Sequence, residues 1–184
     1  MKPTEFRDKW IAAGDELMPF GETDFASTNV TADAKTFLLG AGLPSSAAPF
    51  LEFDGSGKRR FQPVTERFPV PSELGNYLCI GFGGSGDPVC ICGSTGNVAM
   101  LNHDDNFRPI LMNTSIVQLA ESLLVFRHMV DAACAANGDD AYLDGDVPHD
   151  LIQSTRDDIA RADSVAMQEG CFWWTELATL EQMA

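Results

Sequence analysis

The chain has 184 residues, of which 45% are hydrophobic and 21% charged, and its 27 Asp and Glu against 12 Lys and Arg give a net charge of −15. This length allows one folded domain with a substantial core, and the shortage of basic residues argues against nucleic acid as a direct ligand, because phosphate contacts need Lys and Arg. No run approaches the roughly 20 apolar residues of a membrane span, and the first ten residues lack the apolar core of a secretory signal, so we expect a cytoplasmic protein with no membrane partner.

The first predicted element is a helix from about Thr4 to Leu17. Pro3 suits its first turn, because the proline lacks an N–H that would be unpaired there in any case. Apolar residues recur at the spacing of one helical face: Phe6, Trp10, Ala13 and Leu17. The helix therefore has one stripe to bury, and the turn-rich residues 19–31 are expected to connect it to the next element.

A second, shorter helix is predicted from Asp33 to Gly42, with Thr31 or Asp33 as the N-cap and Gly40 or Gly42 at its end. Two strands are predicted next, at residues 50–53 and 61–64, joined by a hairpin turn over residues 54–57. The basic run at residues 58–60 has only three members, so we interpret it as a solvated turn and not as a nucleic-acid site.

The centre of the chain, residues 76–101, contains three short apolar runs separated by glycine-rich turns. The runs are Tyr77 to Ile80, Val89 to Cys92 and Val98 to Leu101, which is the pattern of an antiparallel meander. Glycines 81, 83 and 86 spell the G-x-G-x-x-G pattern of dinucleotide-binding loops. That loop binds phosphate only where a helix follows it, and here another strand follows, so we predict a hairpin loop.

The clearest helix is predicted from Ser115 to Ala136, after a further strand at residues 108–112. Ser115 and Gln118 form a capping-box pattern. Apolar residues then recur every three or four positions: Ile116, Leu119, Leu123, Phe126, Val130 and Cys134. Before this helix, His103 lies beside Asp104 and Asp105, which we interpret as a polar surface turn and not as a metal or acid–base cluster.

The C-terminal part of the chain, from about residue 138, is predicted as an acidic connector followed by two helices. The connector spans residues 139–150, and the helices are expected from about 149 or 150 to 167 and from about 173 to 183. From residue 137 onward the chain holds 11 acids and two bases, a net −9 of the total −15. Negative charge is therefore concentrated in this quarter of the chain.

No catalytic, metal or cofactor site is predicted. Cys90 and Cys92 lie two positions apart on a strand, but a tetrahedral metal site needs further ligands, and no second cysteine or histidine pair has ligand spacing. The acids near Gly145 do not match a calcium-binding loop. The five cysteines are odd in number and mostly lie in apolar segments, which is typical of reduced thiols in the cytoplasm. With none of the common hydrolase, zinc-protease or phosphate-binding motifs present, we do not expect an enzyme.

The order of these elements resembles the SUKH superfamily, and within it the fourth immunity-protein branch. The resemblance covers most of the chain from Ala32 onward. The residues that carry it are Phe37-Leu38, Gly42-Leu43-Pro44, Tyr77 to Gly81, Gly96-Asn97-Val98, Asn113-Thr114-Ser115, Leu119, Phe126, Phe172-Trp173, Leu177 and Leu180. The glycine-rich loop and the acidic segment after Gly138 depart from the family pattern, so the choice of partner does not carry over.

The resemblance implies a single α+β domain over residues 1–184, with a mostly antiparallel sheet of about five to six strands flanked by N-terminal and C-terminal helices. It also implies a non-catalytic protein that binds and neutralises a bacterial toxin domain, commonly a nuclease or nucleic-acid deaminase. Because such toxins present basic clefts, we predict that acidic residues contact the toxin. The first predicted set is Asp139, Asp140, Asp144, Asp146, Asp157 and Asp158, and the second is Asp104 and Asp105. A regulatory scaffold, or a binder of a small ligand at the Gly81 to Gly86 loop, remains the alternative, and the oligomeric state stays open.

Overall fold

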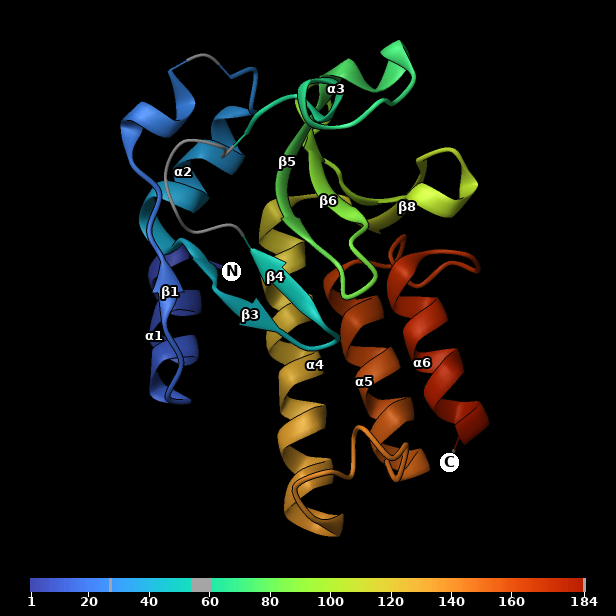
Figure 1. Cartoon of the computed structure of the whole chain (residues 1–184). Helices are drawn as coiled ribbons and strands as arrows, with labels where there is room; N and C mark the ends of the chain where they lie inside the picture. Colours follow the sequence, from blue (N-terminus) through green and yellow to red (C-terminus); the bar gives the residue numbers. More distant parts are fainter. Residues whose placement is uncertain (27, 54–60, 184) are drawn as a thin grey trace.

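The computed structural model describes residues 1–26, 28–53 and 61–183. The helices in these ranges are α1 (Pro3–Ala12), α2 (Ala32–Ala41), α3 (Val64–Arg67), α4 (Ile116–Asn137), α5 (His149–Ala162) and α6 (Phe172–Met183). The strands are β1 (Leu17–Met18), β2 (Leu43–Pro44), β3 (Ser46–Ala47), β4 (Leu51–Phe53), β5 (Tyr77–Phe82), β6 (Pro88–Cys92), β7 (Val98–Asn102) and β8 (Arg108–Asn113). Short 3-10 turns lie at Glu22–Phe25, Ser72–Asn76 and His103–Asp105. The predicted α+β class is confirmed (Figure 1).

Strands β3 to β8 form one antiparallel sheet in which each strand pairs with its neighbour in the sequence. The predicted meander is therefore confirmed, and so is the further strand at residues 108–112. Strands β1 and β2 pair separately as a small antiparallel ribbon. Strand β1 lies beside α1 (Figure 1).

Both faces of the central strands are buried, which explains why these strands are almost continuously apolar in the sequence. Leu78, Ile80 and Ile91 point into the main core, together with the long helices. Cys79 and Cys90, which alternate with them, point to the opposite face and pack in a smaller core that includes the start of α3. The cysteines of these strands are therefore core residues, and all five cysteines of the chain are free thiols.

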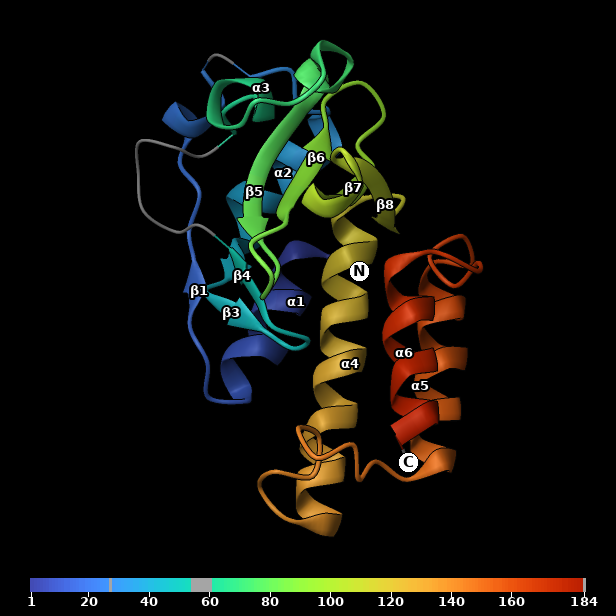
Figure 2. The same cartoon turned by 45° about the vertical axis from the view of Figure 1, so that its right-hand side comes forward.

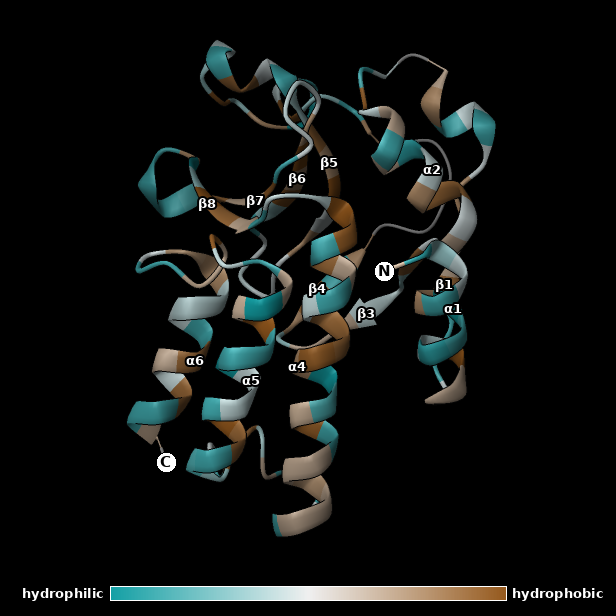
Figure 3. Ribbon diagram, turned by 180° about the vertical axis from the view of Figure 1, so that it is seen from behind, coloured by the Kyte–Doolittle hydropathy of each residue, from teal (hydrophilic) through white to brown (hydrophobic). Residues whose placement is uncertain are grey.

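Helices α4, α5 and α6 lie side by side and extend away from the sheet (Figures 1 and 2). Trp173 on α6 is completely buried, and the centre of its ring lies 5.4 Å from the centre of the tilted ring of Phe126 on α4. From behind, α5 presents mostly hydrophilic residues to solvent, whereas strands β5 to β8 are mostly hydrophobic (Figure 3). The acidic quarter of the chain is thus built on the outer helices, and its apolar residues face α4.

The predicted caps of two helices are confirmed. The Thr31 hydroxyl accepts a hydrogen bond from the Ala34 N–H at the start of α2. At the start of α4, the Ser115 hydroxyl accepts from the Gln118 N–H at 3.2 Å and donates to the Gln118 side chain at 2.9 Å. Four of the predicted stripe residues of α4 are buried, while Val130 and Cys134 are only half-buried.

The predicted N-terminal helix ends five residues too late. Helix α1 stops at Ala12, because Gly14 adopts a positive φ of 95° that reverses the chain, and Leu17 then lies in β1. Phe6 and Trp10 are buried as predicted, but Ala13 is exposed. The helix predicted to reach residue 167 also ends early, at Ala162, where the backbone becomes extended.

The strand predicted at residues 61–64 is wrong. Pro63 forms one isolated bridge with Leu78, and the helix α3 begins at the next residue, Val64. A proline cannot donate to a sheet ladder, which favours this early exit from the sheet. The neighbouring prediction, a strand starting at Phe50, shifts by one residue, because Phe50 has a φ of +53° and β4 begins at Leu51. The predicted turn at residues 54–57 and the basic run at 58–60 lie outside the described residues.

Candidate partner-binding surface

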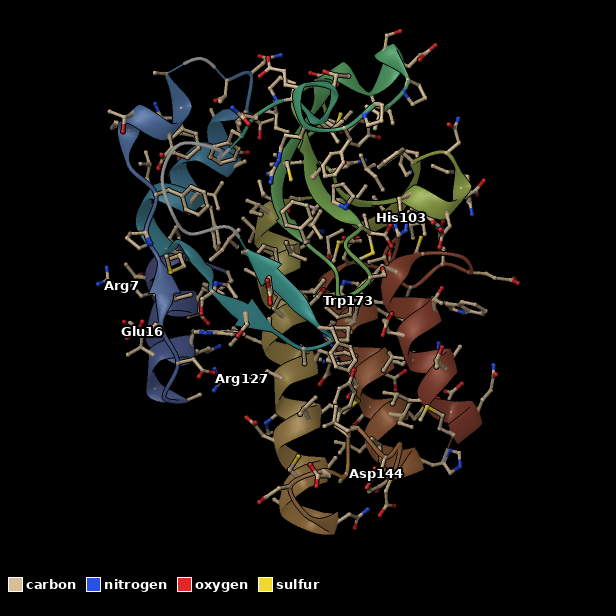
Figure 4. The ribbon with its side chains drawn as sticks, in the orientation of Figure 1. Arg7, Glu16, His103, Arg127, Asp144 and Trp173 are labelled. Carbon is tan, nitrogen blue, oxygen red and sulfur yellow. The ribbon has the colours of Figure 1, made fainter. Side chains whose placement is uncertain are left out.

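Four of the predicted acidic residues lie in the connector between α4 and α5. They are Asp139, Asp140, Asp144 and Asp146, and all four are exposed. None of them forms an ion pair with any residue in the three described ranges. Figure 4 shows Asp144 at the end of α4 that is farthest from the sheet. The connector thus presents four uncompensated carboxylates on one end of the molecule.

The connector is ordered by its own turns. The buried side chains of Ala141 and Val147 anchor it to the core, and the Asp146 N–H donates to the Ala141 carbonyl at 2.8 Å. The Asn137 side-chain amide, at the end of α4, donates to the Asp146 carbonyl at 2.9 Å. These contacts hold the backbone while the carboxylates point to water. The acidic surface is therefore already formed in the free protein.

Asp157 and Asp158 lie on α5 but differ in their surroundings. Asp157 is exposed and accepts one hydrogen bond from Gln153 at 3.1 Å. Asp158 pairs with Arg161 and lines a separate groove between α1, α4 and α5. Asp157 thus has no basic partner among the described residues, like the connector acids, whereas Asp158 has one.

Asp104 and Asp105, the second predicted set, lie in the turn between β7 and β8, far from the α4–α5 connector (Figure 1). Asp105 pairs with Arg108. Asp104 is exposed and lies 3.3 Å from the Nε2 atom of His103. The two predicted sets consequently do not form one continuous surface.

A hydrogen-bonded chain of Ser85, Asp87 and His103 connects the β5–β6 turn to the β7–β8 turn. Ser85 Oγ donates to Asp87 Oδ2 at 2.8 Å, and His103 Nδ1 lies 2.6 Å from Asp87 Oδ1. The hydrogen bond with Asp87, and then the charge of Asp104, raises the pKa of His103. Burial raises the pKa of Asp87, but hydrogen bonds from the His103 N–H, Ser85 and the His103 ring together lower it below its usual value.

This chain does not have the order of a hydrolase triad. In such a triad the histidine lies between the nucleophile and the carboxylate, whereas here the carboxylate of Asp87 lies between Ser85 and His103. Ser85 is therefore not hydrogen-bonded to the histidine, and the arrangement fastens two turns together. The polar turn predicted at residues 102–106 is confirmed, with Asp87 as a partner that the sequence did not indicate.

The glycine-rich loop is a hairpin turn, as predicted. The Gly83 N–H donates to the Asp87 carbonyl at 2.8 Å, and the Gly86 N–H donates to the Gly83 carbonyl at 2.9 Å. Strand β6 follows directly, so no helix N-terminus is available to bind a phosphate. Within residues 1–26, 28–53 and 61–183, no group of three or more His, Cys, Asp or Glu is placed to hold a metal ion. None of the helices described is both long enough and apolar enough to cross a membrane.

A surface feature that the sequence did not indicate surrounds Phe50. This side chain is 63% exposed, at the turn between β3 and β4, with a cleft on each side. The larger cleft has a volume of about 690 Å³ and is bounded by α1, the β3–β4 hairpin, the glycine-rich loop and α4. The smaller one, of about 340 Å³, lies between the glycine-rich loop and Phe172 with Glu176 on α6.

Charged side chains in the larger cleft are mostly acidic. Arg127 lies over the ring of Trp10 at 4.7 Å and pairs with Asp15 at 2.8 Å and with Asp131 at 3.6 Å. Glu52 is exposed beside them and faces the same cleft. The one guanidinium is thus shared by two carboxylates, and the cleft keeps a net negative charge.

Tyr142 and Glu176 complete this region. Burial, and secondarily the charge of Glu176, raises the pKa of the Tyr142 phenol far above its usual value. Burial also raises the pKa of the Glu176 carboxyl. Glu176 forms no hydrogen bond or ion pair with any residue that the structure describes. When a cation binds beside a half-buried carboxyl group that has no partner, it stabilises the charged form of that group.

One comparison with known proteins gives a match. A family model described as SUKH-4 immunity protein matches residues 8–181, which is nearly the whole chain. No curated protein and no solved structure matches this chain.

Proposed function

This chain belongs to the SUKH-4 immunity protein family, which implies immunity against a toxin, and we propose that it acts by binding a bacterial toxin domain without catalysing a reaction. In the chain of Ser85, Asp87 and His103, the carboxylate and not the histidine contacts the serine, which supports a structural role for this chain and not a catalytic one. We propose that this protein is cytoplasmic, because its free thiols would remain reduced there.

The toxin domain is proposed to be a nuclease or a nucleic-acid deaminase from a polymorphic toxin system. Enzymes of these classes bind phosphate through Lys and Arg, so their active-site clefts carry positive charge. A protein with a net charge of −15 is attracted to such a cleft and can occupy it in place of the nucleic acid.

The observation that carries this proposal is the set of four exposed carboxylates on the α4–α5 connector that have no ion-pair partner among the described residues. An acid that already has a basic partner in the free protein gains less from a second one, because its charge is compensated. We therefore propose that Asp139, Asp140, Asp144 and Asp146 contribute most, and that Asp157 contributes in addition. Asp158 and Asp105, which pair with Arg161 and Arg108, contribute less, and Asp104 contributes from a separate site.

The test is co-expression with the toxin domain encoded beside this gene, scored by cell survival and by co-purification. A variant with lysine at the four connector positions should fold but lose protection. Its matched control reverses four exposed acids elsewhere: Asp8, Glu16, Glu73 and Glu169. The control has the same net charge, so a loss confined to the connector variant assigns the contact surface. Equal loss in both variants would mean that only net charge matters, and full protection by both would remove the acidic contact altogether.

A further inference from the structure

The conformation of Phe50 is unfavourable in two respects. Its φ of +53° is unfavourable for a residue with a Cβ, and its ring is 63% exposed to water. A glycine would relieve the backbone at this turn, and a polar side chain would be better solvated. An exposed aromatic in a strained conformation indicates a surface that becomes buried when a partner binds.

Residues of the glycine-rich loop line both clefts beside the Phe50 ring. A Cβ at Gly84 would lie 2.9 Å from the Phe50 Cβ, and one at Gly83 would lie 2.7 Å from the end of the Met100 side chain. Any larger residue at these positions would push the Phe50 side chain away or fill the smaller cleft. The loop thus leaves room beside Phe50 that side chains would otherwise occupy.

The carboxylates around Phe50 give this surface a definite charge. Glu52 faces the larger cleft and Glu176 the smaller one, and neither forms an ion pair with a residue that the structure describes. Arg127 is the only basic residue lining either cleft among the described residues, and it already has two acidic partners. The partner that fits these clefts therefore carries Lys or Arg side chains.

This surface is continuous with the acidic connector. The ring of Phe50 lies 6.2 Å from the ring of Tyr142, which is part of the connector that carries Asp140 and Asp144. An apolar centre with a charged rim is the usual layout of a protein interface, in which a few aromatic residues carry most of the binding energy. The connector supplies the charged part, together with the exposed apolar side chain of Leu143.

We infer that Phe50 is the apolar anchor of the toxin-binding surface, and that basic side chains of the toxin domain enter the clefts beside it and pair with Glu52 and Glu176. This inference rests on the proposed function, because it assigns the surface through which that function acts. It differs from the acidic-connector proposal in naming an aromatic centre and two further carboxylates.

The experiment measures the affinity of purified variants for the toxin domain encoded beside this gene, itself inactivated by a catalytic substitution. Phe50→Ala should weaken binding by at least about 30-fold, because an aromatic anchor of an interface contributes at this level. Ile11→Ala is the matched control, since Ile11 is 50% exposed but lines neither cleft, and its affinity should be unchanged. Glu176→Gln should weaken binding several-fold, whereas Glu169→Gln, on an exposed turn, should not.

The possible failures are distinguishable. If the wild-type protein does not bind the toxin domain, both the proposed function and this inference fall. If the wild-type protein binds and Phe50→Ala binds equally well, only the inference falls. The remaining alternative is that a second copy of this chain covers the Phe50 surface, and light scattering on the protein alone tests it. A dimer that Phe50→Ala dissociates would support that alternative and overturn the inference.

Discussion

The buried carboxylate of Asp163, at the end of α5, connects three elements, and its removal tests how the helices are held to the sheet. Asp163 is 3% exposed, and its Oδ2 atom accepts hydrogen bonds from the Thr114 N–H at 2.7 Å and from the Asn113 side-chain amide at 3.2 Å. Asn113 also donates to Ser122 Oγ at 3.0 Å and accepts from Trp173 Nε1 at 2.8 Å. Asp163→Ala therefore leaves two donors unpaired at the junction of β8, α4 and α6.

The expected loss follows from these contacts. A hydrogen bond to a charged group contributes about 1.5–3 kcal/mol, and leaving a buried donor unpaired costs about as much. Two orphaned donors, one on Thr114 and one on Asn113, therefore predict a fall of about 3–5 kcal/mol in the free energy of unfolding. Asp163→Asn keeps an oxygen in the same place without the charge. Because charge-assisted hydrogen bonds are roughly twice as strong as neutral ones, we expect about half of that loss.

The assay is equilibrium unfolding in urea followed by tryptophan fluorescence, since the buried Trp173 belongs to the same hydrogen-bonded network. Asp157→Ala is the matched control, because Asp157 lies on the same helix but is exposed, and its loss should stay below about 0.5 kcal/mol. A loss of less than about 1 kcal/mol for Asp163→Ala would refute the reasoning, and so would equal losses for the alanine and asparagine variants.

The hydrogen bond with Asp87 is the main reason that the pKa of His103 is raised, so its stabilising contribution is fully present below the unfolded-state pKa of about 6.5 and is lost as the pH rises through the higher folded-state pKa. Melting temperatures measured above and below about pH 6.5 should therefore depend less on pH in His103→Gln than in the wild type, and identical profiles would contradict this. Gly81→Ala would place a Cβ 2.4 Å from the Glu52 carbonyl oxygen, and should lower the free energy of unfolding by more than about 2 kcal/mol. Gly86→Ala meets no atom within 4 Å and strains only a φ of +86°, so a loss of about 1 kcal/mol is expected, and urea unfolding should separate the two variants.

The elements that could be predicted are those whose apolar spacing is dictated by burial. The stripe of α4 begins with Ile116 and Leu119, which are buried as its period of three and four required. The boundaries that failed depend on single backbone conformations. Gly14 ends α1 through a positive φ, and the chain leaves the sheet after a single bridge between Pro63 and Leu78 of β5. Neither conformation leaves a periodic signal in the sequence.

The candidate surface likewise has one part that could be predicted from the sequence and one part that could not. The acidic connector could be predicted because charge is read directly from composition. Counting charge does not separate buried acids from exposed ones, however, and Asp163 belonged to the same acidic quarter although it is 3% exposed. Phe50 was predicted as the first residue of an apolar strand, which indicated neither its positive φ nor its exposure. The position of the Phe50 ring is defined by Tyr142 and Gly84, which are distant from it in the sequence.

On these proposals, the two parts of the surface act at different stages of binding. Exposed carboxylates attract a basic toxin over about one Debye length, roughly 8–10 Å at physiological salt, so the connector raises the association rate and its effect fades as salt increases. Phe50 acts only after contact, when its ring leaves water, so its loss raises the dissociation rate and is insensitive to salt. An immunity protein needs both, because the toxin must be captured before it damages its target and must then stay bound. A pronounced salt dependence of association that survives Phe50→Ala is therefore the kinetic signature of a surface in which charge and aromatic burial have separate tasks.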